Sequence, residues 1–298
     1  MAEDADLAEA MAGLAMLDRA AVPQRMGGLT NRVWRVGSHV LRLPGQGTEA
    51  YIDRANEARA ARQAAAAGVA PDVIHADPAT GIMVTRFVAG AQTMTPQGFR
   101  DRPGAAARAG AAFARLHRSG AVFPARFDLF AMIDGYLRLL APRDVALPAG
   151  YHDVLAEAEG VRAALARAPV APAPCHCDPL CENLLDDGAR MWIVDWEYSG
   201  MNDPMWDLGD LSVEAGMDES QEEAMLTAYF GAEAQAADRG RMMAAKAMCD
   251  LLWTLWGLIQ LSDGNPAEDF RTYAERRFAR CRTLMGQADF ARHLAAIR

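Results

Sequence analysis

The stretch CHCDPLCENLLDDGARMWIVDWEY, residues 175–198, decides the fold. It holds three cysteines within seven positions, and its polar residues His176, Asp178 and Asn183 follow the order H-x-D-x4-N. The letters LL and MWIV on either side of the turn DDG predict two short antiparallel strands. This hairpin brings Asp195, at the end of its second strand, back beside Asn183. We therefore expect two carboxylates and an amide to meet at one end of the hairpin.

These residues match the needs of phosphoryl transfer. That reaction requires a group that orients the attacking hydroxyl, and oxygen ligands for the magnesium on the nucleotide phosphates. An aspartate on a loop, an asparagine beyond it and an aspartate after the next strand follow the logic of the protein-kinase signature. We expect Asp178 to orient the hydroxyl and accept its proton, and Asn183 and Asp195 to bind Mg²⁺. Each residue alone could be a turn former, but the ordered set is specific.

The cysteines suggest an alternative, a zinc site. Structural zinc takes four Cys or His ligands, usually as two separated pairs. Here the candidates share one loop with His176, and the remaining cysteines, Cys249 and Cys281, fall on predicted helices. Zinc is therefore the less favoured interpretation, and an odd total of five cysteines argues against a disulfide framework. We expect the clustered cysteines to fill small, partly buried positions and to make the enzyme sensitive to thiol reagents (Cys175, Cys177 and Cys181).

Composition limits the class of protein. The chain has 298 residues, enough for one large domain or two lobes that share a cleft. A net charge of −9 argues against nucleic acid as a partner and would tolerate a small cationic ligand. The acidic first residues do not resemble a secretory signal, and the longest strongly apolar run, residues 251–261, is short for a membrane span. We expect a cytoplasmic protein without a membrane partner.

The order of predicted elements indicates an α+β fold. Two hairpins, within residues 33–43 and 73–87, flank a helix within residues 51–71. Periodic apolar residues then predict helices over residues 103–119, 129–140 and 151–168, and again from residue 204 to the end. A further helix is expected over residues 4–20, with no assigned role. We place the boundary near residue 90, with a nucleotide-phosphate-binding N-lobe (1–90) and a mainly helical C-lobe that carries the catalytic loop, magnesium site and acceptor pocket (91–298).

At this point the sequence resembles a known family. HCDPLCENLL followed by IVDWEYSGMNDPMWDLGDL is similar to the choline/ethanolamine kinases, within the aminoglycoside-phosphotransferase-like kinases. GGLTNRVWRV, VLRLPG, IDR..E and GVAPDVI agree in order and approximate spacing, so the resemblance spans roughly residues 27–278. It implies the bilobal fold of protein kinases, with a small N-lobe of antiparallel sheet and one helix. It also implies ATP-dependent phosphorylation of a small alcohol, with Asp178 catalytic and Asp195 bound to magnesium.

The nucleotide side departs from the protein-kinase pattern. The loop reads GGLTN, ending at Asn31, and Arg42 stands where protein kinases have a strand lysine. The resemblance implies that Arg42 is the family's usual residue here, and an arginine can bind phosphate oxygens in two places. Glu57 is its expected ion-pair partner, although an ordinary surface pair is the alternative. Phe87 and Val88 form the expected hinge, whose backbone would meet adenine.

An aromatic set predicts the acceptor pocket. Trp253 and Trp256 are neighbours on one helical face, and a quaternary ammonium is best held by aromatic rings. From the helix alone these tryptophans are better explained as core residues. The resemblance implies that they line a choline pocket together with Tyr273.

Acidic residues complete the expected site. Asp207, Asp210 and Glu214 have helical spacing. We expect Asp207 to brace the catalytic loop together with His176. Glu214 is the candidate that faces the positive charge of the substrate, and Glu197 is a further substrate-binding candidate.

Together these features predict a small-molecule kinase that uses ATP and Mg²⁺ to phosphorylate choline. The alternatives are ethanolamine, thiamine or an aminoglycoside as acceptor, or a catalytically silent nucleotide-binding regulator. The two tryptophans favour a methylated ammonium over a primary amine. The oligomeric state does not follow from the sequence.

Overall fold

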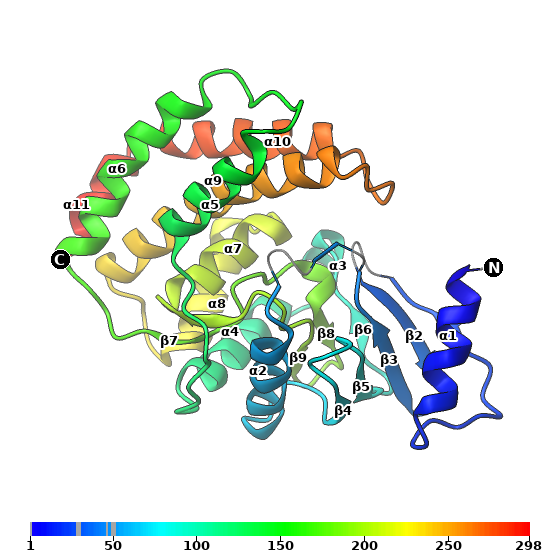
Figure 1. Cartoon of the computed structure of the whole chain (residues 1–298). Coiled ribbons are helices and arrows are strands. Elements are labelled where there is room, and N and C mark those ends of the chain that lie inside the picture. The colour runs from blue at the N-terminus through cyan, green and yellow to red at the C-terminus, as the bar shows by residue number, and fades with distance from the viewer. Residues whose placement is uncertain (1, 28–30, 46, 49–51) are drawn as a thin grey trace.

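The computed structural model describes residues 2–27, 31–45, 47–48 and 52–298 (Figure 1). The N-terminal part contains α1 (Ala2–Gly13), β1 (Gln24–Arg25), β2 (Arg32–Val36), β3 (His39–Leu43), α2 (Arg54–Ala66), β4 (Val73–Ala76) and β5 (Met83–Arg86). Its strands form one antiparallel sheet in the order β1-β2-β3-β5-β4. Both hairpins expected from the sequence are present, and Gly37 allows the tight turn of the first with a φ of +61°.

The two faces of this sheet have different partners. Successive side chains of a strand point to opposite faces. Trp34, Leu41 and Val84 pack on one face against Leu14 and Leu17, which follow α1. The expected helix over residues 4–20 is thus shorter than predicted, and it covers the outer face of the sheet. The other face carries Arg42 and lines a cavity.

Helix α2 attaches the sheet to the rest of the chain. Its alanine-rich face is buried against the strands, and Asp53 caps its first turn by accepting from the N–H groups of Ala55 and Asn56. Asn56 is 4% exposed; its amide donates to the carbonyl of Ser199 at 2.8 Å, and its oxygen accepts from the N–H of Ala125 at 3.0 Å. The first turn of α2 is therefore fixed to two segments of the C-terminal part.

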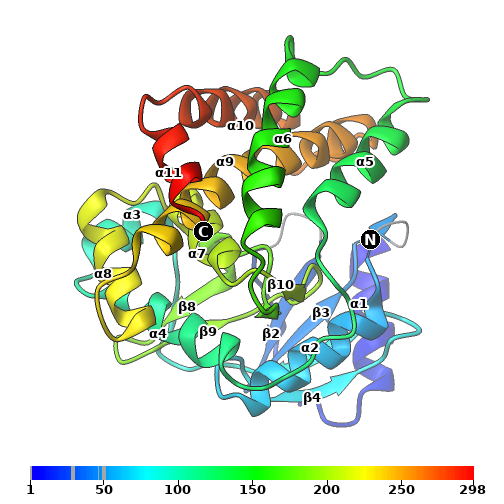
Figure 2. The ribbon, with the colours of Figure 1, turned by 90° about the vertical axis from the view of Figure 1, so that its left-hand side faces the viewer.

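The remainder of the chain is mainly helical. Helices α5, α6, α9, α10 and α11 gather at the top of Figure 1, whereas Figure 2 shows α3, α4 and α8 on the side away from α1 and β4. Two small sheets, β6-β8-β9 and β7-β10, lie among them. The elements are β6 (Gln92–Thr93), α3 (Pro96–Asp101), α4 (Ala105–His117), α5 (Leu129–Leu140), α6 (Tyr151–Arg167), β7 (Ala173–Cys175), the short 3₁₀ helix η2 (Cys181–Asn183), β8 (Leu184–Asp186), β9 (Met191–Ile193), β10 (Gly200–Asn202), α7 (Met205–Ala215), α8 (Glu219–Phe230), α9 (Ala236–Ser262), α10 (Phe270–Met285) and α11 (Phe290–Ala296).

The fold is the expected α+β, bilobal, protein-kinase-like arrangement, with an antiparallel sheet followed by a large helical part. The hairpin of β8 and β9 pairs Leu184 with Ile193, as predicted from the sequence. The position of the boundary near residue 90 stays a prediction.

Helix α9 is the long central helix of the C-terminal part. It has 27 residues and includes the apolar run 251–261, so it is longer than that run suggested. By length and composition this helix could cross a membrane. However, 89% of its apolar 18-residue segment is buried inside the protein. It packs against α5, α7, α10 and α11. Gly257 lets α10 approach closely, because a Cβ at this position would lie 2.6 Å from the ring of Tyr273.

A buried carboxylate joins the β8 strand to helices α3 and α4. Asp186 is fully buried, and it accepts from Arg102 at 2.6 Å and from Arg108 at 2.7 and 2.8 Å. Burial alone would raise the pKa of Asp186, but the hydrogen bonds from Arg108 and Arg102 outweigh it and lower the pKa to about 2. This cluster anchors the hairpin that carries Asp195.

We predict that Asp186→Asn lowers the free energy of unfolding at pH 7 by about 2–3 kcal/mol, because Arg102 and Arg108 lose their carboxylate partner. Both arginines are partly exposed to solvent, so this loss is smaller than that expected for a fully buried ion pair. The folded-state pKa lies below the unfolded value of 3.8. The stabilisation that the Asp186 carboxylate gives to the folded state is therefore complete above pH 3.8 and is lost as the pH falls through about 2. Denaturant titrations of both proteins from pH 7 to pH 2 should give curves that converge at the acid end.

Asp72→Asn provides the control, because Asp72 and Arg86 form an exposed pair at 3.3 Å. Exposed pairs contribute about 0–1 kcal/mol. A loss for Asp186→Asn no larger than this, or a constant difference down to pH 2, would contradict the prediction.

Candidate active site

The loop after β7 is fixed by one buried carboxylate. Asp207, in the first turn of α7, is fully buried and accepts from the backbone N–H groups of His176 and Cys177, both at 2.8 Å. Its second oxygen also bonds Nε2 of His117 at 2.9 Å. Cys177 has a φ of +69°, in the left-handed region that non-glycine residues rarely adopt. These contacts hold the loop in a strained conformation just before Asp178.

His176 connects this loop to the strand that precedes Asp195. Its Nε2 lies 2.9 Å from the carbonyl of Val194, and its Nδ1 lies 3.3 Å from the N–H of Asp178. Since a carbonyl only accepts and a backbone N–H only donates, Nε2 carries the proton and Nδ1 accepts. Burial lowers the pKa of His176, which agrees with this neutral form.

Asn183 and Asp195 lie at the mouth of the hairpin. The side chain of Asn183 donates to the carbonyl of Asp178 at 3.0 Å, and the backbone carbonyl of Asn183 accepts from the N–H of Val194 at 2.9 Å. Asp195 has a φ of +65°, a left-handed conformation that costs about 1–2 kcal/mol for such a residue. The sharp turn directs its carboxylate toward Arg42. The structure therefore brings together Asp178, Asn183 and Asp195, as the spacing predicted.

The N-terminal part contributes a cluster of charges to the same place. Arg42 donates to Glu57 and lies 3.3 Å from Asp195 and 4.0 Å from Glu197. Arg42 and Glu57 are buried, so they are not an ordinary surface pair. Asn31 donates to Glu197 at 3.0 Å and to Asp195 at 3.3 Å. Residues 28–30 of the GGLTN loop lie outside the described residues.

Arg54 belongs to this cluster, and the sequence reasoning missed it. Its Nη1 donates to Glu57 at 2.9 Å and to Glu197 at 3.1 Å, and its Nη2 donates to Thr48 at 2.6 Å. Burial and the neighbouring Asp195 raise the pKa of Glu197 to about 7 despite these partners. The i, i+3 spacing of Arg54 and Glu57 on one helix was the available signal.

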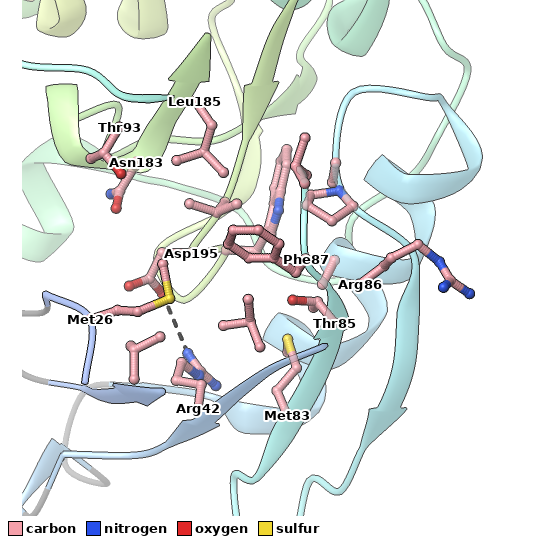
Figure 3. A pocket seen from close by; sticks show the side chains of 18 of the residues that line it. Met26, Arg42, Met83, Thr85, Arg86, Phe87, Thr93, Asn183, Leu185 and Asp195 are labelled. Atoms are coloured by element: carbon pink, nitrogen blue, oxygen red, sulfur yellow. Dashed lines mark hydrogen bonds and ion pairs between the residues drawn. The ribbon is translucent and has the colours of Figure 1, made fainter. Parts of the chain in front are cut away.

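A cavity of about 270 Å³ lies between the sheet and the hairpin (Figure 3). Asn183 and Asp195 enter it from the hairpin, and Arg42 enters from the strands. Phe87 and Val88, the expected hinge, also line it. The remaining walls are largely apolar, with Val33, Val40, Ala61, Met83 and Leu185 among the lining residues. Such a slot with apolar walls suits a flat ring.

A second cavity, of about 560 Å³, begins where the first one ends. Asp178 lies in its wall, and Glu182, Asn183 and Asp195 line both cavities. Its other walls include the aromatic residues Tyr198, Trp253, Trp256 and Tyr273. The rings of Tyr198 and Trp253 are 5.1 Å apart, and those of Trp256 and Tyr273 are 5.7 Å apart.

Two acidic residues expected to face a substrate are already engaged. Glu214 lines the second cavity, but its carboxylate lies 2.7 Å from Arg277, so its charge is largely matched within the protein. Glu197 is likewise held by Arg54 and Asn31. The guanidinium of Arg277 also lies 4.6 Å from the ring centroid of Tyr273. The spacing of Glu214 gave no sign of this arginine, which comes from α10, over 60 residues later.

The available donors distinguish the two metals considered. Carboxylate and amide oxygens, as in Asp195 and Asn183, are ligands that suit Mg²⁺. Among the described residues, the groups that could hold a metal are Glu57, Asp195 and Glu197, and separately His117, Cys175 and Asp207. The second group includes Cys175 but neither Cys177 nor Cys181, so the crowded cysteines do not converge on one metal position among the described residues.

The cysteines are buried. All five are free thiols with exposures of at most 2%. Burial raises the pKa of each thiol, which lowers the fraction of reactive thiolate. The structure therefore argues against the thiol sensitivity expected from the crowding of cysteines near Asp178.

We predict that Ellman's reagent reacts with the native protein slowly and with fewer than five thiols, and that all five react after denaturation in guanidinium. Absorbance at 412 nm measures the released thiolate. Rapid reaction of the native thiols, together with loss of activity, would instead support the thiol sensitivity expected from the sequence.

Comparisons with known proteins show the family and the fold of the chain. The Phosphotransferase enzyme family model matches residues 21–245. A choline/ethanolamine kinase family protein from Mesorhizobium loti is 62% identical, with a TM-score of 0.90 over 98% of this chain and 99% of that one. Choline kinase LicA from Streptococcus pneumoniae shares the fold at 24% identity, with a TM-score of 0.80 over 99% of both chains. A LicA complex with AMP is similar at 23% identity, with a TM-score of 0.77 over 98% of both chains.

The matched region includes the loop, the hairpin and the sheet around the first cavity, whereas Trp253, Trp256 and Tyr273 of the second cavity lie beyond it. The family reaction is phosphoryl transfer to an alcohol, which agrees with the residues that meet between the cavities. The chain belongs to the phosphotransferase enzyme family and, within it, to the choline/ethanolamine kinase family.

Proposed function

We propose that this phosphotransferase transfers the γ-phosphoryl group of ATP to the hydroxyl of choline, giving phosphocholine and ADP. The observation that carries the proposal is the junction of the two cavities at Asn183 and Asp195. A nucleotide in the first cavity would present its terminal phosphate there. An acceptor in the second would present its hydroxyl beside Asp178.

The first cavity supports a nucleotide. Its apolar walls suit adenine, and the backbone at Phe87 and Val88 would supply the hydrogen bonds. Arg42 at the opposite end would bind phosphate oxygens, with Glu57 and Arg54 fixing its orientation and Asn31 bridging to Asp195. A bidentate arginine suits phosphate better than a point charge does.

Asn183 and Asp195 would hold magnesium, whose charge would offset that of the transferring phosphates. The hydrogen bond from the Asn183 side chain to the carbonyl of Asp178 would keep the two magnesium ligands close to Asp178. The contact of Asp195 with Arg42 at 3.3 Å would adjust when the phosphates enter.

Asp178 would orient the hydroxyl of the acceptor and receive its proton late in the transfer. Burial raises the pKa of Asp178 well above its ordinary value, and the nearby carboxylates of Asp210 and Asp195 add to this. A raised pKa makes a carboxylate a better proton acceptor. Positioning and charge stabilisation supply most of the rate in this kind of reaction.

The acceptor pocket supports choline over a primary amine. Four aromatic side chains border it, and aromatic faces attract a trimethylammonium by about 0.5–2 kcal/mol per contact. A primary ammonium would need hydrogen-bond acceptors; Glu214 and Glu197 are already engaged by arginines, which leaves Glu182 and Glu268 among the glutamates that line the cavity. Ethanolamine, thiamine and aminoglycosides are the competing acceptors.

The test is a panel of alcohols with ATP and Mg²⁺, followed by coupled ADP release. We expect choline to give the highest kcat/KM. If ethanolamine, thiamine or an aminoglycoside turns over and choline does not, the proposal is wrong.

Asp178→Asn should reduce kcat by about 10²–10⁴-fold while leaving the thermal unfolding temperature nearly unchanged, because it removes the proton acceptor but keeps the shape. Steady-state kinetics with choline and a melting curve provide the measurements. A kcat within a fewfold of wild type would exclude Asp178 as the base.

Arg54→Gln should lower kcat/KM for ATP by about tenfold or more, because charge-assisted hydrogen bonds contribute about 1.5–3 kcal/mol and these ones orient Glu57 and Glu197. Arg59→Gln is the matched control, since Arg59 is an exposed residue of the same helix. Equal kinetics for the two variants would show that Arg54 has no positioning role.

A further inference from the structure

Asp210 is a buried carboxylate that has no contact with nucleotide or acceptor in the reaction described above, although it helps to raise the pKa of Asp178. It lies on α7, is fully buried and is absent from the lining of the second cavity. One oxygen accepts from Nε1 of Trp253 at 3.3 Å. The other, Oδ1, has no hydrogen-bond partner among the described residues. A buried oxygen without a partner costs free energy and calls for an explanation.

The charges around Asp210 do not balance. Three carboxylates, Asp210, Glu214 and Asp250, share this region with the two guanidinium groups of Arg277 and Arg280. Arg277 lies 2.7 Å from Glu214 and 3.2 Å from Asp250, and Arg280 binds both oxygens of Asp250 at 2.6 Å. In the part of the chain that the structure describes, no arginine or lysine comes within ion-pair distance of Asp210. The carboxyl group that lacks a matching positive charge is therefore that of Asp210.

Trp253 separates this carboxylate from the cavity. The indole ring lines the acceptor pocket, and its N–H is directed at Asp210 behind the wall. An N–H that donates to a carboxylate leaves more electron density on the ring, and the ring face attracts cations through that density. The carboxylate itself also acts over a longer range here than in water, because the surroundings are dry.

We propose that Asp210 determines the charge specificity of the acceptor pocket: acting through Trp253, it makes the pocket prefer a cation over a neutral molecule of the same shape. The inference rests on the acceptor pocket of the proposed function and adds a residue that does not touch the acceptor. A bound cation would supply the positive charge that the cluster lacks. Burial and the nearby Glu214 raise the pKa of Asp210, as expected for a carboxyl without a cationic partner in the empty pocket.

The experiment compares choline with 3,3-dimethylbutan-1-ol, in which a neutral tert-butyl group replaces the trimethylammonium. Binding to the protein is followed by quenching of tryptophan fluorescence, and turnover by ADP release. For the wild type we expect a clear preference for choline. Asp210→Asn should reduce the ratio of the two affinities by about tenfold, with the affinity for the neutral alcohol and the KM for ATP little changed.

Trp253→Phe provides the second variant, because it keeps an aromatic ring but removes the N–H. If Asp210 acts through Trp253, Asp210→Asn should change the preference much less in the Trp253→Phe background. An equal loss for both alcohols in Asp210→Asn would mean that the residue only supports the fold, and would overturn the proposal.

The binding measurement separates this inference from the proposed function. A wild-type protein that binds the cation preferentially but does not phosphorylate it would contradict choline as the acceptor and leave the assignment of Asp210 intact. A wild type that binds both alcohols equally would overturn the assignment of Asp210.

Discussion

The hydrogen bonds of Asp207 are the constraint on which the rest of the site depends. A carboxylate sealed from solvent accepts from two consecutive N–H groups of the loop after β7 and from His117. Carboxylates bonded to several donors in a dry environment are strong anchors. They compensate for the left-handed backbone of Cys177, and so the next residue, Asp178, is presented at the wall of the acceptor cavity. His176 then connects this loop to the residue after β9, because its Nε2 donates to the carbonyl of Val194 while its Nδ1 accepts from the N–H of Asp178.

From that anchor, the segment DWEYS (195–199) connects the two halves of the site. Asp195 and Glu197 point toward Arg42, Arg54 and Asn31 of the N-terminal part. Tyr198, between them and Ser199, packs against Trp253 on the acceptor side. One short stretch thus contacts both the charged cluster around Arg42, through Asp195 and Glu197, and the aromatic pocket, through Tyr198.

Sequence reasoning could predict the features that depend on local order. The two N-terminal hairpins, the hairpin after Asn183 and the helix Leu129–Leu140 follow from turn residues and periodicity. The pairing of Arg42 with Glu57 followed from the resemblance. Contacts between distant segments were not accessible in this way. The two-residue strand β6 pairs with β8 across some 90 positions, and the neutralisation of Glu214 by Arg277 joins α7 to α10. No local pattern announces either contact, because each depends on how whole helices pack.

The attachment of helix α2 has a consequence for control of the enzyme. In protein kinases the helix that carries the corresponding glutamate can swing away, and its position serves as an on/off switch. Here Asn56 binds Ser199 and Ala125, while Arg54 ties the same helical turn to Glu197. An outward swing would leave these buried polar groups without partners, at a cost of about 1–3 kcal/mol each. The same contacts therefore disfavour an outward movement of α2 in this fold.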